Sequence, residues 1–234
     1  MTIYSDLIQH QKNQRKLLAI LVDPDKIILK NIPELVQNIA QTQADYIFVG
    51  GSFLSRGHFK KVVKKLKKYS QLPVIIFPGN TSQISKQADA ILLLSLISGR
   101  NAEYLIGKQV EAAPRLYHSR LETIATGYIL IENGRTTTVE YISNSKPIPR
   151  NKPDLAVATA LAGQMLGLQL IYLEAGSGAK KRVPLQMIKK VKEIIDIPLI
   201  VGGGIKNKKQ VLQAWNAGAD LVVVGTAFEN NNFK

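Results

Sequence analysis

The sequence contains no cysteine among its 234 residues. Disulfide bonds and thiolate metal sites are therefore excluded, and the absence fits the cytoplasmic location that we expect. Long apolar runs are missing as well. No stretch reaches about 18 uninterrupted apolar residues, so we expect no membrane span. The first residues, Met1 to Asp6, lack the charged-then-apolar order of a signal peptide.

Acidic residues are few relative to basic ones. The chain has 17 Asp and Glu against 31 Lys and Arg, a formal net charge of +14. Such an excess favours anionic partners, namely phosphorylated metabolites, anionic lipid surfaces or nucleic acid. Between Lys60 and Lys68, apolar residues at helical spacing separate the lysines. This run predicts the solvated face of an amphipathic helix, with docking to a membrane surface or to a nucleic acid as the alternative.

Aromatic residues and histidines are also scarce. Aromatics make up 6% of the chain and seldom lie among the basic residues, and no nucleic-acid-binding motif occurs, so we expect no nucleic-acid partner. His10, His58 and His118 lack metal-ligand spacing, which predicts structural or surface roles. Trp215, the single tryptophan, lies in a helical pattern, where we expect packing or an oligomer contact.

Apolar runs alternate with helical patterns from one end of the chain to the other. The runs predict strands at 17–22, 46–49, 74–77, 90–94, a longer stretch from 123 to 143 with a turn at Asn133 and Gly134, 170–173, 199–201 and 221–224. Helices are predicted at 3–11, 32–42, 58–69, 102–112, 156–166, 185–195 and 208–217. This order predicts an α/β fold with a single (β/α)₈ TIM-type barrel over residues 1–234. The connection from Phe77 to Ala90 is too short for an ordinary barrel helix, so the third helix is expected to be missing or replaced by a loop.

Glycine follows three of the last apolar runs. These segments are 172–178, 201–205 and 224–226. Glycine at the end of a buried strand lets backbone N–H groups approach an anion closely. The loops after the seventh and eighth strands of a barrel are its usual phosphate site. Together the three segments predict one phosphate pocket, which makes an enzyme the expected class of protein. The residues expected to hold the phosphate are Ser177, Gly178, Gly203, Gly204, Gly225 and Thr226.

Acidic and hydroxyl side chains follow other strands. Asp23 comes after the first predicted strand and Ser52 after the second, so the two can share one Mg²⁺. The alternative for Asp23 is that it caps the turn beside Pro24. Tyr172 and Glu174 share one face of the sixth strand. If that face is the barrel interior, Glu174 can act as general base with Tyr172 as its hydrogen-bond partner; the alternative is a glutamate paired with a lysine.

These motifs together resemble the geranylgeranylglyceryl phosphate synthase family, which includes bacterial heptaprenylglyceryl phosphate synthases. The matching segments are 21–26, 49–52, 77–80, 172–179, 201–205 and 224–226, and the resemblance covers nearly the whole chain. It implies a Mg²⁺-dependent prenyltransferase that is a homo-oligomer. In the implied reaction, the C3 hydroxyl of sn-glycerol 1-phosphate attacks C1 of a polyprenyl diphosphate, geranylgeranyl in the main expectation, and pyrophosphate leaves.

The resemblance also implies roles for individual residues. Asp23 and Ser52 would hold the metal, and Glu174 would be the base, with Tyr172 beside it. The glycerol phosphate would be held by Tyr172, Leu173, Glu174, Ala175, Gly176, Ser177, Gly178, Gly203, Gly204, Gly225 and Thr226. Some bacterial members carry a lysine where this chain has Leu21, so a cationic contact must come from elsewhere or be absent.

Two other hypotheses remain open from the residues. One is another phosphate-binding barrel isomerase or lyase that acts on a phosphorylated small molecule. It would need an Asp or Lys pair at opposite strand ends, and no strand-end lysine accompanies Asp23 and Glu174. The other is a basic barrel that binds anionic lipid or nucleic acid without catalysis, which gives Glu174 no purpose.

Overall fold

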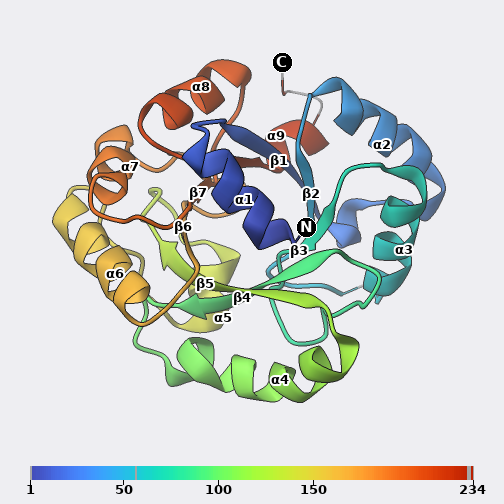
Figure 1. Ribbon diagram of the computed structural model, residues 1–234, viewed down its shortest axis with the longest axis horizontal. Helices are drawn as coiled ribbons and strands as arrows, with labels where there is room; N and C mark the ends of the chain where they lie inside the picture. The colour runs from blue at the N-terminus through green and yellow to red at the C-terminus, as the bar shows by residue number, and fades with distance from the viewer. Residues whose placement is uncertain (1, 56, 231–232, 234) are drawn as a thin grey trace.

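Eight parallel strands pair in sequence order and close into one barrel (Figure 1). The computed structural model describes residues 2–55, 57–230 and 233. The strands are β1 (Leu17–Val22), β2 (Tyr46–Val49), β3 (Val74–Ile76), β4 (Ala90–Leu96), β5 (Glu122–Leu130), β6 (Leu170–Glu174), β7 (Leu199–Gly202) and β8 (Leu221–Val224). Closure is made by β8 against β1, with Leu17 opposite Leu221. The predicted barrel is confirmed.

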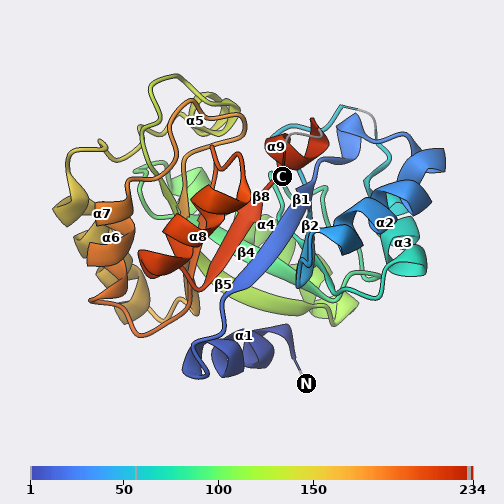
Figure 2. The ribbon, with the colours of Figure 1, turned by 90° about the horizontal axis from the view of Figure 1, so that it is seen from above.

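Helices surround the barrel and cover one of its ends (Figures 1 and 2). The outer helices are α2 (Ile32–Gln41), α3 (Phe59–Tyr69), α4 (Lys108–Ser119), α6 (Pro153–Met165), α7 (Leu185–Lys192) and α8 (Lys208–Asn216). Short 3₁₀ turns, Pro24–Lys26 and Leu29–Asn31, precede α2, and a π-helical turn, Glu103–Gly107, precedes α4. At the C-terminal ends of the strands lie α5 (Thr138–Ser143) and α9 (Thr226–Glu229), whereas α1 (Ile3–Lys12) crosses the opposite end. Among the described residues, no helix is long and apolar enough to cross a membrane.

The connection between β3 and β4 contains no helix. Residues 77–89, all of which the structure describes, form turns and irregular backbone. The expectation of a missing third helix is therefore confirmed. As a result, the outer surfaces of β3 and β4 have no helix of their own between α3 and α4.

Apolar side chains form two layers because successive residues of a strand point to opposite faces. Tyr46, Phe48 and Tyr172 belong to the layer inside the barrel. Ile47 and Leu173 belong to the outer layer between strands and helices. This alternation turns Tyr172 and Glu174 inward, as the sequence predicts.

The N-terminal end of the barrel is closed by α1. Glu122, at the start of β5, accepts the backbone N–H groups of Ile3 and Tyr4 at 2.7 and 2.8 Å. Tyr46 donates its hydroxyl to Asp6, and Leu7 enters the inner core. Any substrate must therefore enter from the other end or from the side.

Two predicted segments differ from the structure. The stretch from 123 to 143 is not β throughout, because β5 ends at Leu130 and residues 138–143 form α5. A bend follows at Gly134, and a capping box, Thr137 with Glu140, begins the helix. The helix predicted at 102–112 is instead a π turn followed by α4, which continues through Pro114 to Ser119.

Candidate active site

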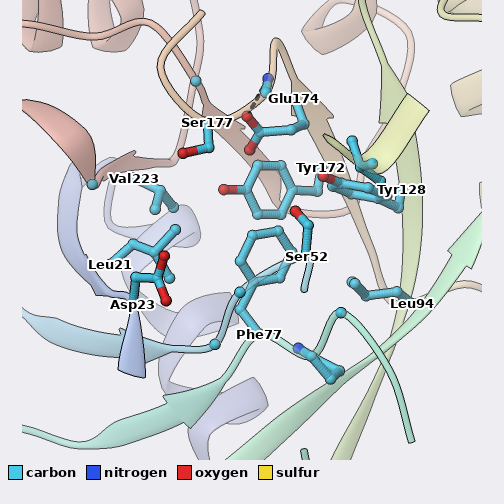
Figure 3. A pocket seen from close by; sticks show the side chains of 18 of the residues that line it. Leu21, Asp23, Ser52, Phe77, Leu94, Tyr128, Tyr172, Glu174, Ser177 and Val223 are labelled. Carbon is cyan, nitrogen blue, oxygen red and sulfur yellow. Dashed lines mark hydrogen bonds between the residues drawn. The ribbon is translucent and has the colours of Figure 1, made fainter. Parts of the chain in front are cut away.

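A cavity of about 660 Å³ opens at the C-terminal ends of the strands (Figure 3). Most of the residues that the sequence selected line it: Asp23, Ser52, Tyr172, Glu174, Gly176, Ser177, Gly178, Gly203, Gly204, Gly225 and Thr226. Leu173 and Ala175 do not, because their side chains are buried in the outer core. The strand-end prediction therefore brings the proposed acid, hydroxyl and glycine groups into one space.

Glu174 is the last residue of β6 and lies 6% exposed against the cavity. Its Oε1 accepts the backbone N–H of Gly176 at 2.5 Å. Burial raises the pKa of Glu174 from 4.5 to about 7, while the hydrogen bond from Gly176 and the nearby Tyr172 hydroxyl lower that pKa. A carboxyl group with this pKa is partly ionised near neutral pH, which is the property a general base needs.

Three aromatic rings form the apolar wall beneath Glu174. Phe77 and Tyr172 stack with their centroids 5.0 Å apart, and Tyr128 meets Tyr172 edge-on at 5.5 Å. The Tyr172 hydroxyl is buried and has no hydrogen-bond partner of normal geometry among the described residues. Both that hydroxyl and Glu174 Oε2 lie close to Gly202. A buried hydroxyl without a partner is costly in free energy, so a polar ligand group at this point would relieve that cost.

Glycine is required next to Glu174 for steric reasons. Gly203 has a φ of +81°, and a Cβ there would lie 2.3 Å from Glu174 Oε1 and 2.6 Å from the Gly176 nitrogen. A side chain at Gly203 would therefore displace the carboxylate or its donor. Across the mouth, Ser177 Oγ lies 3.4 Å from Thr226 Oγ1, which joins the loops after β6 and β8. The predicted glycine segments thus meet around one small polar region.

Asp23 lies on the other side of the cavity from Glu174 (Figure 3). Its Oδ1 accepts the Asp25 N–H at 3.1 Å, so it does cap the turn at Pro24, and it also lines the cavity. Its Oδ2 lies 3.5 Å from the Lys26 ammonium, which pairs with Glu229 at 2.7 Å. Among the described residues, no group of three or more acidic or histidine side chains could hold a metal. A metal at Asp23 and Ser52 would depend on oxygens from a ligand.

Residues 10–234 match the PcrB family. The chain belongs to this family. It is 55% identical over 231 residues to a geranylgeranylglyceryl phosphate synthase of Flavobacterium johnsoniae, covering 99% of this chain and 95% of the relative. A Thermococcus kodakarensis protein of the same name is 46% identical over 222 residues, covering 94% and 87%.

A solved structure agrees with these relatives. The (S)-3-O-geranylgeranylglyceryl phosphate synthase of Thermoplasma acidophilum, in complex with sn-glycerol-1-phosphate, superposes with a TM-score of 0.92 and 35% identity. The match covers 98% of this chain and 92% of that one. The family resemblance that the motifs indicated is therefore confirmed.

Leu21 stands where some bacterial relatives were expected to carry a lysine, and it lines the cavity beside Gly225. Positive charge reaches this PcrB-family cavity from other elements. Four lysines line it: Lys26, Lys108, Lys180 and Lys206. They come from the loops after β1, β6 and β7 and from the first residue of α4. The cationic contact that Leu21 cannot make can therefore come from any of these lysines. The strand-end motifs alone did not reveal them.

Residues after β5 brace the loop that carries Glu174, and sequence analysis missed them. Asn133 is 2% exposed and donates its side-chain amide to the carbonyl of Ala175 at 2.7 Å. Arg135 donates to the carbonyl of Ser177 at 3.1 Å. Asn133 and Gly134 have the sequence signature of a hairpin turn. The hairpin signature indicated a local turn and gave no sign of the hydrogen bond between Asn133 and Ala175, which are 42 positions apart.

The cavity also has an apolar arm. It passes Leu94 and Leu96 and reaches Ile84, Ala112 and Leu116, which pack outside β4. Ile84 belongs to the connection that lacks a helix, and the other two belong to α4. The missing helix therefore leaves a path from the polar mouth to the side of the barrel, suited to a long apolar chain.

Neither the histidines nor Trp215 reach this cavity in the described structure. His10 donates a hydrogen bond from its ring Nδ1 to the Asp6 carbonyl and lies next to Arg15, while His58 and His118 are exposed. Trp215 donates its indole N–H to the carbonyl of Leu17 at 3.0 Å and packs against the outer core. The structural and surface roles predicted for these side chains agree with these positions.

Proposed function

We propose that this protein joins a polyprenyl group, most simply geranylgeranyl, to the C3 hydroxyl of sn-glycerol 1-phosphate and releases pyrophosphate. The names of its relatives and the glycerol phosphate complex of the Thermoplasma acidophilum structure support this function. The observation that carries it is Glu174, a carboxyl group with a pKa of about 7 placed where a glycine-rich polar region meets an apolar arm.

The polar region would take the glycerol phosphate. Backbone N–H groups at Ser177, Gly204 and Thr226 and the hydroxyls of Ser177 and Thr226 favour a phosphate at this mouth. Because the loop after β6 carries Ser177 close to Glu174, a phosphate bound there would bring the glycerol end near the Glu174 carboxylate. The C3 hydroxyl would then lie within the reach of a carboxylate that is held by the Gly176 N–H and that lies so close to Gly203 that no side chain fits between them.

Glu174 takes the hydroxyl proton as the new ether bond forms. The C3 oxygen bonds to C1 of the prenyl group, the bond from C1 to the diphosphate oxygen breaks, and its electron pair leaves with pyrophosphate. The Phe77, Tyr128 and Tyr172 rings keep water away from C1, so water does not compete with the hydroxyl. The positive charges of the lysines around the mouth stabilise the negative charge on the leaving diphosphate.

Asp23 and Ser52 fit a bound Mg²⁺. The ion usually takes one or two carboxylates and completes its shell with water and phosphate oxygens, and this side of the cavity offers one carboxylate and one hydroxyl. When bound, Mg²⁺ would neutralise the leaving diphosphate. Lys26, 3.5 Å from Asp23, adds positive charge at the same place.

A transfer assay tests the proposal. Purified protein is incubated with Mg²⁺, labelled sn-glycerol 1-phosphate and a C15, C20 or C35 prenyl diphosphate, and butanol-extractable label is counted. We expect product with at least one donor, most with C20, and much less with the sn-glycerol 3-phosphate enantiomer. Absence of extractable label with every donor would contradict the proposal.

A further inference from the structure

A second, cationic cleft continues the apolar arm of the cavity. This cleft of about 540 Å³ shares Ile84 with the large cavity. Its lining combines Lys60 at the start of α3, Lys86 in the connection without a helix, and Arg115 and His118 on α4. Figure 1 shows α3 and α4 on either side of that connection. The apolar path and the positive charge thus meet on one flank of the barrel.

Several of these charges have no acidic partner. Lys64 lies one turn after Lys60 on the same face of α3. Lys60, Lys64 and Lys86 are exposed, and the part of the chain that the structure describes forms no ion pair with them. Lys67 differs, because it binds Asp89 at 2.8 Å. We call Lys60, Lys64, Lys86 and Arg115 the cationic rim, and His118 lies beside it.

An exposed tyrosine lies next to the cationic rim, and other exposed apolar side chains occur on the same two helices. Tyr117 on α4 is 82% exposed and meets the His118 ring edge-on at 5.6 Å. Val110, also on α4, is 65% exposed, and Tyr69 ends α3 with 41% exposed. A tyrosine has an apolar ring and a polar tip, which suits the boundary between lipid and water. Basic residues combined with such side chains are typical of surfaces that lie on a membrane.

We propose that the cationic rim docks this protein on an anionic lipid bilayer. The apolar arm then opens against the membrane, so that a prenyl chain can pass between bilayer and cavity without crossing water. This second part rests on the proposed function, whereas docking does not. A nucleic acid could neutralise the same charges, but it would leave the apolar opening and Tyr117 in water, so the bilayer matches more of the surface.

Vesicle binding tests the docking. The protein is sedimented with vesicles of phosphatidylcholine alone or with 30% phosphatidylglycerol, at low salt and at high salt. We expect binding to the anionic vesicles, weakened by salt because exposed charges are screened. Neutral vesicles should bind much less protein. Equal binding to both compositions would overturn the proposal.

Two variants with the same change in charge locate the surface. Lys60→Glu with Lys64→Glu alters the cationic rim, and Lys208→Glu with Lys209→Glu alters α8 on the far side of the barrel (Figure 1). Each basic residue near an anionic surface contributes about fivefold to binding, so the rim variant should lose at least about 25-fold. The α8 variant should stay within about threefold of the original protein. Equal losses would overturn the assignment, and unchanged thermal unfolding excludes misfolding as the cause.

Turnover separates docking from catalysis. With donor in neutral detergent micelles, both variants should match the original protein, whereas with donor in anionic vesicles the rim variant should be slower. If no donor reacts but vesicle binding still depends on the rim, the proposed function fails and docking stands. If turnover is normal but the protein does not bind anionic vesicles, the docking proposal is overturned and the proposed function stands. Displacement from vesicles by a DNA duplex, with tighter binding to the DNA, would favour a nucleic acid instead.

Discussion

The two ends of the barrel differ in how far their buried and half-buried polar groups are hydrogen-bonded. At the closed end, Glu122 receives two backbone N–H groups from α1 and Tyr46 bonds to Asp6. At the open end, the Tyr172 hydroxyl has no partner of normal geometry among the described residues. There, Glu174 receives a single backbone N–H.

The difference separates structural polar groups from those available for chemistry. Buried groups that satisfy one another stabilise the fold and have nothing left to offer a ligand. Buried groups without full hydrogen-bond partners raise the free energy of the folded state. A ligand that forms those missing hydrogen bonds removes this cost, and the gain contributes to its binding free energy. Substitutions at the open end should therefore affect turnover, and those at the closed end should affect stability.

The largest effect is expected from Glu174→Gln. Loss of the base should lower kcat by about 10²-fold or more, measured in the transfer assay. In the original protein kcat/KM should rise with pH and level off above about 7, the pKa of Glu174. The variant should lack that rise. Glu193→Gln, at the exposed residue that caps the C-terminus of α7, is the control, and turnover of the Glu174 variant equal to that control would assign Glu174 a structural role.

The same substitution should increase stability at alkaline pH. The folded-state pKa of Glu174 lies above its ordinary value, so between pH 4.5 and about 7 the folded protein binds more protons than the unfolded chain. Its contribution to stability is therefore lost as pH rises through that window. Glutamine cannot ionise, so the variant should unfold at a higher temperature than the original protein at about pH 8, with the difference absent at about pH 4.

A smaller effect on turnover is expected from Gly203→Ala. Its Cβ would overlap Glu174 Oε1 and the Gly176 nitrogen, and misplacement of a catalytic group by about 1 Å can lower turnover by up to about 10²-fold. We expect at least a tenfold fall in kcat/KM for glycerol phosphate. Gly134→Ala is the matched control, because its φ is +89° but no atom lies within 4 Å of the added Cβ. Equal losses in both variants would point to backbone strain rather than to contact with Glu174.

The smallest effect on turnover is expected at the closed end, from Glu122→Gln. The amide replaces one acceptor with a donor that faces another N–H group, so about 1–3 kcal/mol of unfolding free energy should be lost. Urea unfolding measures the loss, with Glu193→Gln expected to stay within about 0.5 kcal/mol. We expect kcat to stay unchanged. A fall in kcat at 25 °C, with the protein still folded, would show that the two ends are coupled.

Much of the fold could be predicted because each strand is a short apolar run with a clear end. The segment after Leu130 could not, because Thr136, Thr137 and Val139 favour β structure and Asn133–Gly134 resembles a hairpin turn. The capping box of Thr137 and Glu140 starts a helix there instead. The helix predicted over 102–112 also ended too early: α4 continues through Pro114, because Val110 is 65% exposed and water can satisfy the carbonyl that proline leaves free.

The candidate site was predictable where it depends on strand ends and not where it depends on distant contacts. Asp23, Glu174 and Gly203 follow strands, and barrel geometry brings such positions together. Tyr128 lies within β5 and packs edge-on against Tyr172, and Asn133, beyond β5, hydrogen-bonds the loop that follows Glu174. Nothing in the local pattern around these two residues distinguishes them from ordinary core and turn positions.

The missing helix between β3 and β4 has a thermodynamic consequence. In an ordinary barrel, a covalently attached helix would cover the outside of these strands, and its contribution to folding stability would not depend on the concentration of any ligand. Here part of that apolar surface lines the arm of the cavity, so under the proposed function folding stability would gain a term that rises with the logarithm of prenyl donor concentration. The prenyl chain would then act as a removable part of the hydrophobic core. The lifetime of the folded protein would depend on how much prenyl donor is present.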